Sequence, residues 1–477
     1  MVATPPTPVP LYVDLDGSLI KSDLLVESAL RLFKRSPFNL FRMTSWLLLR
    51  GKARLKAEIA QRVDLDASTL PYRTEVIDLI RRAREAGRPV VLATASNLKF
   101  AQQVADHLGL FDGVLASTAD TNLSGSRKLE AIRAHAASGE FSYVGNEATD
   151  LAIWRHAKSA IVCADSRLAK EAAAVTRVDA HVDVPRAGIK TFARAIRLHQ
   201  WVKNALIFLP FVPLVSTLPL GEWMRGVIGF VCFGLCASSV YLINDLLDLD
   251  ADRVHARKKF RPIPSGDMSL TTAVALVPVL LLAAFALAAI ALPLIFSIVL
   301  LVYWLLTNFY SLDLKRRVNV DIVALAILYT MRLLDGSAIL MIRPSIWILA
   351  FSVFFFFSLA TAKRMIELDN TKKKHASTIA GRGYIVEDMA VLLAQGAASG
   401  QIAVLVFALY INDSANSHFH RPEALWGICP LMLLWINRVW LKLNRGELHD
   451  DPVVFALRDG FSQVAVLLAA VCIAIAA

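Results

Sequence analysis

The 477-residue chain has few cysteines, and they follow no metal-ligand pattern. Of the five, Cys232 and Cys236 are one helical turn apart in an apolar run, where packing is the expected role. The first ten residues have neither a basic segment nor a long apolar core. We therefore expect no cysteine-based site and no signal peptide, and a first domain that remains in the cytoplasm.

Charged residues are also scarce. They make up 19% of the chain, against 56% hydrophobic residues and a mean hydropathy of +0.51, which excludes an ordinary soluble protein. Residues up to about 190 have ordinary charge content, and long apolar runs dominate the rest. In the apolar part of the chain the basic residues gather in the connections between the runs, a distribution that indicates membrane topology, so we expect no nucleic-acid partner despite the net charge of +11.

The apolar runs predict an all-α membrane domain of nine transmembrane helices. We place them at about 205–220, 223–243, 270–288, 291–310, 321–340, 345–362, 388–411, 424–441 and 453–476. Residues 186–204 form a basic, amphipathic connecting segment that could lie along the membrane surface. The predicted domains are therefore 1–185, the linker 186–204, and 205–477.

Basic residues are distributed unequally between the two sides of this predicted bundle. Four alternate connections, 244–269, 311–320, 363–387 and 438–452, hold 17 Lys and Arg residues, whereas the opposite connections offer Arg343 and Arg421. The positive-inside rule then places the basic loops in the cytoplasm. We predict an integral inner (cytoplasmic) membrane protein whose first domain and active sites are cytoplasmic and whose carboxyl terminus is outside.

Four aspartates lie within eight residues directly after the second predicted span, at Asp245, Asp248, Asp250 and Asp252. Acidic side chains are costly near hydrocarbon, so such a cluster indicates a functional site. If the segment is helical, Asp245, Asp248 and Asp252 share one face and repel one another unless a cation lies between them. Because Mg²⁺ takes carboxylates together with substrate phosphates, the cluster predicts Mg²⁺–diphosphate chemistry at the membrane surface.

The first 185 residues predict an α/β domain of Rossmann-like type. Residues 8–13, 89–93 and 141–145 read as buried strands, and helical patterns at 75–86 and 98–107 separate them. Alternating strands and helices indicate a parallel sheet, whose ligands bind at the carboxyl ends of the strands. Polar motifs stand at those ends, among them Asp14-Leu-Asp16-Gly-Ser.

The membrane half resembles the UbiA superfamily of intramembrane prenyltransferases. The resemblance rests on Asn244-Asp245-x-x-Asp248-x-x-x-Asp252, on Tyr310-Ser-x-x-Leu-Lys315 and on Asp321. A second Asp-rich motif is usual after the sixth span, but here Lys363 and Arg364 partly replace it. Together with Gln200-Trp-Val-Lys203-Asn, Lys258-x-Phe-Arg261-Pro-Ile and His449-Asp-Asp-Pro452, this departure resembles the polyprenyl-phosphate phosphoribosyltransferase branch.

That resemblance implies transfer of phosphoribose from phosphoribosyl diphosphate to a polyprenyl phosphate. By position, Asp245, Asp248 and Asp252 would be catalytic and would hold Mg²⁺. The implied substrate-binding residues are Asn244, Lys203, Arg257, Lys258, Arg261, Tyr310, Lys315, Asp321, Lys363 and Arg364.

The first domain resembles the haloacid dehalogenase-like hydrolases in four motifs, carried by Asp14-x-Asp16-Gly-Ser, Thr94, Lys128 and Gly145-Asn-Glu-x-x-Asp150. The resemblance implies that Asp14 is a nucleophile and Asp16 a general acid and base. It also implies that Thr94 and Lys128 bind the phosphoryl group, and that Asp150 joins Asp14 and Asp16 around Mg²⁺. The residues between about 22 and 70 would form a small helical cap.

Fusion of the two parts predicts a bifunctional membrane enzyme. It would attach 5-phosphoribose to the lipid and then remove the 5-phosphate, which gives polyprenyl-phosphoryl-ribose. Membrane lipids are the expected surroundings. Two alternatives stay open: a prenyltransferase that moves a prenyl group from its diphosphate to a small acceptor, and a transporter of anionic lipids with a regulatory domain.

Overall fold

A computed structural model describes residues 8–136, 139–185, 187–373, 375, 377–378, 382–413, 419–448 and 452–477, so His449, Asp450 and Asp451 of the last quoted motif lie outside the described residues. The chain forms two compact units. Met1–Arg197 and Tyr241–Val277 make up unit 1, and Leu198–Val240 and Pro278–Ala477 make up unit 2. Unit 1 thus combines the α/β part with the segment that carries the Asp cluster.

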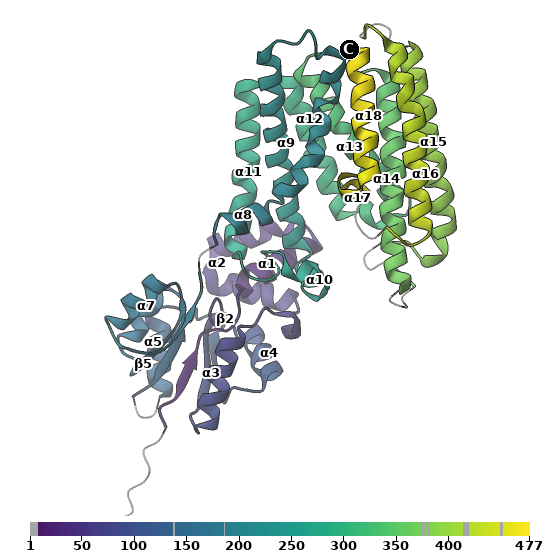
Figure 1. Ribbon diagram of the computed structural model, residues 1–477. Helices are drawn as coiled ribbons and strands as arrows, with labels where there is room; N and C mark the ends of the chain where they lie inside the picture. The colour runs from purple at the N-terminus through teal and green to yellow at the C-terminus, as the bar shows by residue number, and fades with distance from the viewer. Residues whose placement is uncertain are drawn as a thin grey trace, which may run out of the picture. The chain divides into compact units, whose positions relative to one another are not determined.

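A six-stranded parallel sheet forms the centre of the α/β part, in the order β3-β2-β1-β4-β5-β6 (Figure 1). Its strands are β1 Leu11–Val13, β2 Val90–Asn97, β3 Gly113–Ser117, β4 Ser142–Gly145, β5 Ser159–Ala164 and β6 Arg177–Asp183. Leu11 is in register with Val90 on one side and with Ser142 on the other, so β1 lies between the two halves of the sheet. This is where a doubly wound sheet binds its ligands.

Two hydrophobic cores cover the two faces of this sheet. Helices α3 Thr74–Glu85 and α4 Leu98–Leu108 pack on the face that includes Leu11 and Val13. Helices α5 Ser126–His135, α6 Leu151–Trp154 and α7 Ser166–Ala173 pack on the face that includes Tyr12. The alternation of side chains along β1 places consecutive residues in opposite cores. The predicted Rossmann-like parallel sheet is confirmed.

A helical cap follows β1, as the sequence predicts. It consists of α1 Leu24–Arg35, α2 Asn39–Arg62 and the short 3-10 helix η1 Ala67–Thr69. Asp23 caps the start of α1 by accepting a hydrogen bond from the amide of Val26. Gly51 has φ of +74° and divides α2 into an outer part and an inner part. The inner part carries the buried Leu55 and Ile59, which pack against Leu32 of α1.

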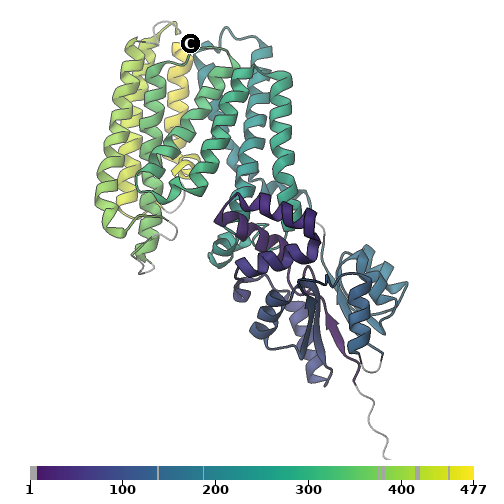
Figure 2. The ribbon, with the colours of Figure 1, turned by 180° about the vertical axis from the view of Figure 1, so that it is seen from behind.

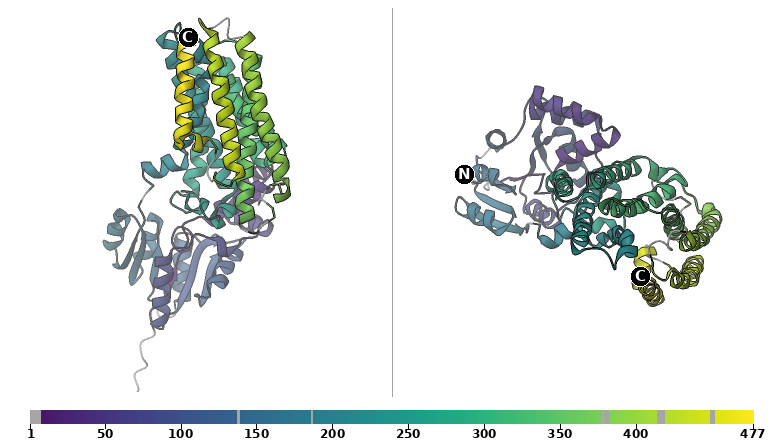
Figure 3. Two further views of the ribbon diagram at one scale, coloured as in Figure 1. Left: turned by 45° about the vertical axis from the view of Figure 1, so that its right-hand side comes forward. Right: turned by 90° about the horizontal axis from the view of Figure 1, so that it is seen from above.

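Seven helices of the described residues are long and apolar enough to cross a membrane (Figure 2). They are Leu220–Leu247 (α9), Leu270–Ala291 (α11), Leu294–Leu312 (α12), Val320–Ile339 (α13), Ile346–Lys373 (α14), Val386–Asp413 (the 3-10 helix η6 Val386–Asp388 with α15 Met389–Asp413) and Pro422–Asn444 (the 3-10 helix η8 Pro422–Gly427 with α16 Ile428–Asn444). In the view from above in Figure 3, helices of unit 2 are seen close to end-on, as in a bundle. The predicted helical membrane domain is thus confirmed in its type.

The predicted number of nine transmembrane α-helices is not confirmed in the part of the chain that the structure describes. The first predicted span forms the 3-10 segment η3 Leu198–Leu214, which contains Pro210 and Pro213. Proline lacks the amide hydrogen that an α-helix needs, and this accounts for the different winding. The last predicted span is divided into α17 Pro452–Arg458 and the shorter apolar helix α18 Gly460–Ala476.

Candidate active sites

Two carboxylates follow strand β1 at the carboxyl edge of the sheet. Asp14 and Asp16 come directly after three buried apolar residues, Leu11, Tyr12 and Val13. The next residue, Gly17, has φ of +76°, and a Cβ atom there would collide with the side chain of Asn146. Only glycine adopts this conformation readily and leaves that space free. The turn therefore holds both carboxylates against the loop that follows β4.

Asp14 is buried and pairs with Lys128 from α5. The Nζ atom of Lys128 lies 2.7 Å from Oδ1 of Asp14, and it also donates to the Tyr143 hydroxyl at 3.0 Å. Burial raises the pKa of Asp14 to about 6, although the charge of Lys128 opposes this shift. Burial lowers the pKa of Lys128, but Asp14 and Asp150 outweigh it, so that the pKa is raised overall. The structure therefore brings together a carboxylate and an ammonium group, both withdrawn from water.

Asp16 is surrounded by neutral hydrogen-bond donors instead. Its Oδ2 atom accepts from the Ser96 hydroxyl at 2.6 Å, and its Oδ1 atom accepts from the amide of Leu24, the first residue of α1, at 2.8 Å. Burial, with the negative charge of Asp23, raises the pKa of Asp16 to about 7, against the hydrogen bond from Ser96. A carboxyl group with this pKa holds and releases a proton near neutral pH, as a general acid and base must.

Asp150 is buried a little deeper in the same cluster. One carboxylate oxygen accepts from the Tyr143 hydroxyl at 3.0 Å, and the other accepts from the amides of Asn146 and Glu147. Asn146 in turn accepts a hydrogen bond of 3.0 Å from Ser18, which also donates to Asp14 at 3.3 Å. Asp14, Lys128 and Asp150 thus lie in one connected hydrogen-bond network.

Thr94, on β2, and Lys56, in the cap, make polar contacts close to Ser96, the partner of Asp16. Thr94 is fully buried at the end of β2, and its hydroxyl accepts from the amide of Ser96. Lys56 of α2 donates to the carbonyl of Ala95 at 2.6 Å and to the side chain of Asn122 at 2.8 Å. Burial lowers the pKa of Lys56, while Asp16 and Asp23 oppose that shift. The sequence analysis missed Lys56, Ser96 and Tyr143, because no local motif marks them.

A large cavity adjoins Asp16 and Asn146 within unit 1. Its volume is about 1090 Å³, at the upper end of the range of ligand pockets. Lys21 and Arg73 contribute positive charge to its wall, and Leu270 and Thr272, at the start of α11, line it as well. Asp16 therefore faces a large open space within unit 1.

The Asp-rich segment forms a second cluster, also in unit 1. Asp245 and Asp252 are both buried, and Nη1 of Arg261 lies 2.9 Å from the first carboxylate and 2.7 Å from the second. Arg197 also donates to Asp245, and Nζ of Lys258 lies 3.2 Å from Oδ1 of Asp252. Two acidic side chains and three basic ones therefore meet here, as the predicted phosphate and metal chemistry requires. Arg197 was missed, because it lies 48 residues before its partner.

Asp248 lies at a break between two helices. The helix is interrupted there, since α9 ends at Leu247 and α10 Leu249–Val254 begins after it. Backbone hydrogen bonds from the amide of Asp248 to the carbonyl of Asn244, at 2.9 Å, and from the amide of Asp252 to the carbonyl of Asp248, at 2.8 Å, nevertheless continue the helical spacing across the break. The carboxylate of Asp248 lies 3.3 Å from Lys34 of cap helix α1.

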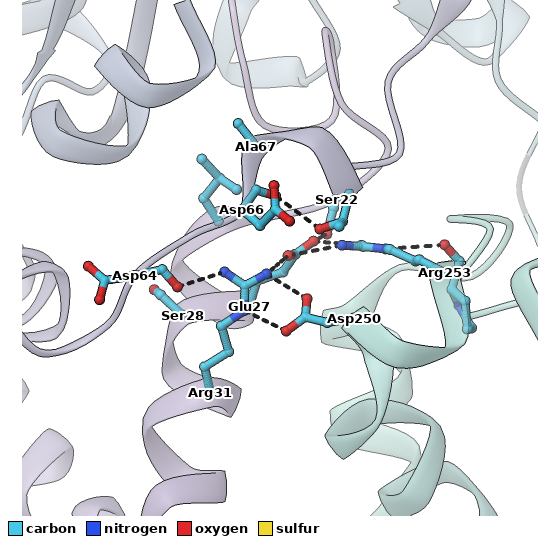
Figure 4. Close-up of polar contacts among 12 residues, drawn as sticks. Ser22, Glu27, Ser28, Arg31, Asp64, Asp66, Ala67, Asp250 and Arg253 are labelled. Atoms are coloured by element: carbon cyan, nitrogen blue, oxygen red, sulfur yellow. Dashed lines mark hydrogen bonds and ion pairs between the residues drawn. The ribbon is translucent and has the colours of Figure 1, made fainter. Parts of the chain in front are cut away.

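Two further ion pairs connect α1 with the Asp-rich segment (Figure 4). Arg253 donates to both oxygens of Glu27, at 3.1 and 2.6 Å, and Glu27 also accepts from Ser22. Arg31 contacts both oxygens of Asp250, at 3.0 and 2.6 Å. The side chains of Glu27 and Arg253 are 1% and 6% exposed, so this pair is buried. No sequence pattern signals it, because 226 residues separate the partners.

A third cluster surrounds Asp321 in unit 2. This fully buried carboxylate accepts from Nε of Arg364 at 2.6 Å and from the hydroxyl of Tyr384 at 2.5 Å. Arg364 also contacts Glu367 at 2.9 Å and donates to the Tyr310 hydroxyl at 3.0 Å. Three sequence-predicted residues, Tyr310, Asp321 and Arg364, are thereby brought together. Tyr384 and Glu367, with Arg382 at 3.5 Å from Asp321, are the partners that the motifs did not reveal.

The remaining predicted residues lie on several elements. Asn244 precedes Asp245 on α9, and Lys363 precedes Arg364 on α14. Lys315 lies in the 3-10 helix η5 Leu314–Arg316, and Nζ of Lys203 lies 5.9 Å from the ring centre of Tyr329. Arg257 is exposed, and its amide donates to the ring of His255.

The carboxylates offer hard oxygen donors of the kind that Mg²⁺ prefers. Within the described part of the chain, however, no three His, Cys, Asp or Glu side chains converge as a metal centre would require. Lys128, Ser96, Tyr143 and backbone amides occupy the first set of carboxylates, and basic side chains occupy the second. Oδ1 of Asp252 is buried without a hydrogen bond among the described residues, although Lys258 lies nearby, so this atom is suited to a cation.

Comparison with known families separates the helical membrane part of the chain from the α/β part. The UbiA prenyltransferase family matches residues 205–461, which is more than half of the chain. This protein belongs to the UbiA prenyltransferase family. The haloacid dehalogenase-like hydrolases match residues 13–155, so the UbiA domain is preceded by a haloacid dehalogenase-like hydrolase domain. Family membership and the seven apolar helices identify an integral membrane protein.

Three relatives are similar over most of their own length. The uncharacterized protein y4nM of Sinorhizobium fredii is 38% identical over 461 residues, which cover 94% of this chain and 88% of that one. Nodulation protein NoeC of Azorhizobium caulinodans is 30% identical over 281 residues, 58% of this chain and 90% of its own. The decaprenyl-phosphate phosphoribosyltransferase of Mycolicibacterium smegmatis is 31% identical over 290 residues, 59% and 90% respectively.

Proposed function

We propose that this UbiA-family protein transfers 5-phosphoribose from phosphoribosyl diphosphate to a polyprenyl phosphate, and that its first domain then removes the 5-phosphate. The likeness to the Mycolicibacterium smegmatis protein, whose name states a phosphoribosyl transfer to a lipid phosphate, is the observation that carries the first step. The network of Asp14, Asp16 and Lys128 supports the second.

In the transfer, the bond between C1 of ribose and the diphosphate oxygen breaks, and a bond from C1 to an oxygen of the lipid phosphate forms. The departing diphosphate takes the electron pair, so stabilising its charge is the main catalytic task. Asp245, Asp248 and Asp252 would hold Mg²⁺, which neutralises diphosphate charge when bound. Arg261 and Lys258, which lie beside two of these carboxylates, would exchange them for phosphate oxygens.

Unit 2 carries a set of cations of its own. Arg364 is held by Asp321 and Glu367, so its position is fixed before substrate binds. Lys363, Lys315 and Lys203 are the proposed phosphate contacts of this unit, with Tyr310 in support. Asn244, in unit 1, would support the neighbouring Asp245. The replacement of a second Asp-rich motif by Lys363 and Arg364 suits two anionic substrates better than one neutral acceptor.

In the hydrolysis, an oxygen of Asp14 attacks phosphorus, and the bond from phosphorus to the ribose 5-oxygen breaks. Asp16 gives its proton to that oxygen and then takes a proton from the water that hydrolyses the aspartyl phosphate. Lys128 and Thr94 would hold the phosphoryl oxygens. Asp150 would join Asp14 and Asp16 around Mg²⁺. With pKa values of about 6 for Asp14 and about 7 for Asp16, the nucleophile is ionised and the acid is partly protonated near neutral pH.

The proposed orientation in the membrane follows from the distribution of basic residues. Loops that carry Arg257, Lys315, Lys363 and Lys442 would face the cytoplasm, together with the first domain and both sets of carboxylates. The carboxyl terminus would lie outside.

The donor of the transfer decides between this proposal and conventional prenyl transfer. The purified protein, with Mg²⁺ and a polyprenyl phosphate, is given phosphoribosyl diphosphate labelled in the ribose. A parallel sample receives a labelled prenyl diphosphate with 4-hydroxybenzoate as acceptor. We expect label in the lipid only from the ribose donor, and none with Asp245→Asn. Prenylated acceptor instead, from protein that is folded, would replace the proposal with the prenyltransferase alternative.

A further inference from the structure

The outer part of cap helix α2 exposes an apolar face that no described residue of unit 1 covers. Phe38, Phe41, Leu48 and Leu49 are 76%, 73%, 77% and 80% exposed. Their spacing of three, ten and eleven residues from Phe38 places all four within about one third of the helix circumference. We call these four side chains the apolar face of α2. Exposed apolar patches of this kind mark interaction surfaces.

The opposite face of the same helix accounts for its attachment to the cap. Met43 and Trp46 pack on the small core formed by Leu32, Leu55 and Ile59. Gly51 then turns the chain, so that the outer part projects from the cap while the inner part remains in the core. The apolar face is therefore exposed because the helix packs on the cap core with its other side, through Met43 and Trp46.

The charge around the apolar face is of one sign. The segment from Lys34 to Ala57 contains seven Lys and Arg residues and no Asp or Glu. Arg42 and Lys52 are exposed beside the apolar face, whereas Arg54 is paired with Glu58. A helix that combines exposed Phe and Leu with basic residues is typical of segments that lie in the surface of an anionic membrane.

The position of α1 brings this face close to the bilayer boundary. Lys34, near the end of α1, donates to the carbonyl of Leu247 at 2.6 Å, and Leu247 is the last residue of the candidate span α9. Arg31 and Glu27 fix the same helix to Asp250 and Arg253 (Figure 4). Phe38 follows Lys34 by only four residues, a chain length of at most about 14 Å. The apolar face thus begins within one short connection of a span terminus.

We propose that the apolar face of α2 inserts into the surface of an anionic lipid bilayer, with Arg42 and Lys52 at the headgroups. The cap is then a membrane-bound element as well as a cover for the phosphatase carboxylates. A second copy of this chain is the competing occupant, and its charge argues against it, because two faces rich in Lys and Arg repel each other.

The test places a fluorophore on the apolar face of the full chain in bilayer discs. Leu48→Cys, or Phe41→Cys in a second variant, is labelled in a Cys472→Ser background, since the other four cysteines are buried. The discs contain phosphatidylglycerol and lipids with a nitroxide on the acyl chain. The matched control is Arg81→Cys on α3, an exposed site in the same domain. At both positions of the apolar face we expect strong quenching by the nitroxide lipid and little quenching by iodide. At the control we expect strong quenching by iodide and little by the nitroxide lipid.

A charge variant tests the lipid preference. The double variant Arg42→Gln with Lys52→Gln should lower quenching by the nitroxide lipid in phosphatidylglycerol discs. Each removed charge should weaken the insertion equilibrium of the apolar face by roughly fivefold. In zwitterionic discs it should change little. The proposal is overturned if the label at Leu48 is quenched by iodide as readily as the control. It is also overturned if Leu48→Cys forms disulfide-linked dimers at one chain per disc on average while nitroxide quenching is absent, which would identify a second copy as the occupant.

Discussion

The α/β domain and the Asp-rich segment each hold a pair of candidate catalytic aspartates, but they surround them differently. Asp16 is held by a hydroxyl and a backbone amide, and Asp14 by one lysine. Asp245 and Asp252 share Arg261, with Arg197 and Lys258 beside them. Neutral donors allow a carboxyl group to keep a proton, whereas a guanidinium group does not release its own and favours the carboxylate form. The first arrangement suits proton transfer, and the second suits binding of charged phosphate and metal.

The largest expected effect separates the two activities. Asp14→Asn should lower hydrolysis of a phosphate ester by at least about 10³-fold, because the nucleophile is lost, and should leave transfer intact. Asp245→Asn should abolish transfer and leave hydrolysis of the phosphate ester intact. Both rates can be measured on the same preparations. Loss of both activities in either variant would contradict independent sites.

The buried pair of Glu27 and Arg253 should dominate the stability of the connection between α1 and the Asp-rich segment. Glu27→Ala leaves Arg253 buried without its partner, at an expected cost of about 3–5 kcal/mol. Hydrogen exchange of residues 249–254 measures the loss. The double variant Glu27→Leu with Arg253→Met should recover much of it.

Asp250→Ala is the matched control for that pair. The side chain of Asp250 is half exposed, so loss of its ion pair with Arg31 should cost less than about 1 kcal/mol. An equal effect of Asp250→Ala and Glu27→Ala would show that burial does not determine the strength of these contacts.

Removal of divalent cations should reveal the raised pKa values of Asp14 and Asp16. A carboxyl group whose pKa is raised by folding stabilises the folded state fully below its unfolded value of 3.8, and this stabilisation is lost as pH rises through about 6 and about 7. In EDTA the α/β domain should therefore lose stability from pH 4 to 7.5, by a few degrees in Tm or roughly 1–2 kcal/mol. Asp16→Asn should flatten this profile, and a profile as steep as that of the wild type would contradict the assignment.

The smallest expected effect concerns Ser96. Its hydrogen bond lowers the pKa of Asp16, so Ser96→Ala should raise that pKa further, in keeping with a bond of about 1 kcal/mol. The alkaline limb of the pH profile for phosphate-ester hydrolysis should move upward. Ser45→Ala, on the exposed part of α2, is the control and should leave the limb in place.

The sequence predicted the elements that depend on local patterns. Buried runs such as Leu11–Val13 and the helices at Thr74–Glu85 and Leu98–Leu108 were found from periodicity, and the polar residues after the strands followed from the geometry of a parallel sheet. The first predicted span does not form an α-helix where it contains Pro210 and Pro213. Hydropathy indicated a span there, but hydropathy does not reflect that proline lacks an amide hydrogen.

Contacts between distant residues could not be predicted in the same way. Arg197 with Asp245, Glu27 with Arg253, and Lys56 with Asn122 join segments whose spacing has no period. Charge alone did not identify them, since many Lys and Arg residues near predicted spans serve topology equally well. The exposed face of α2 could not be predicted for a related reason. The sequence of an apolar helix does not tell which of its side chains the rest of the fold covers.

The most direct test of the central claim is the mass of the lipid product over time. The protein is supplied with polyprenyl phosphate, phosphoribosyl diphosphate and Mg²⁺, and wild type is compared with Asp14→Asn. The proposal predicts that Asp14→Asn accumulates the lipid that carries 5-phosphoribose, whereas wild type converts it to the lipid that lacks the 5-phosphate. A wild-type product that keeps its 5-phosphate throughout would contradict the claim that the two sites act in succession on one lipid.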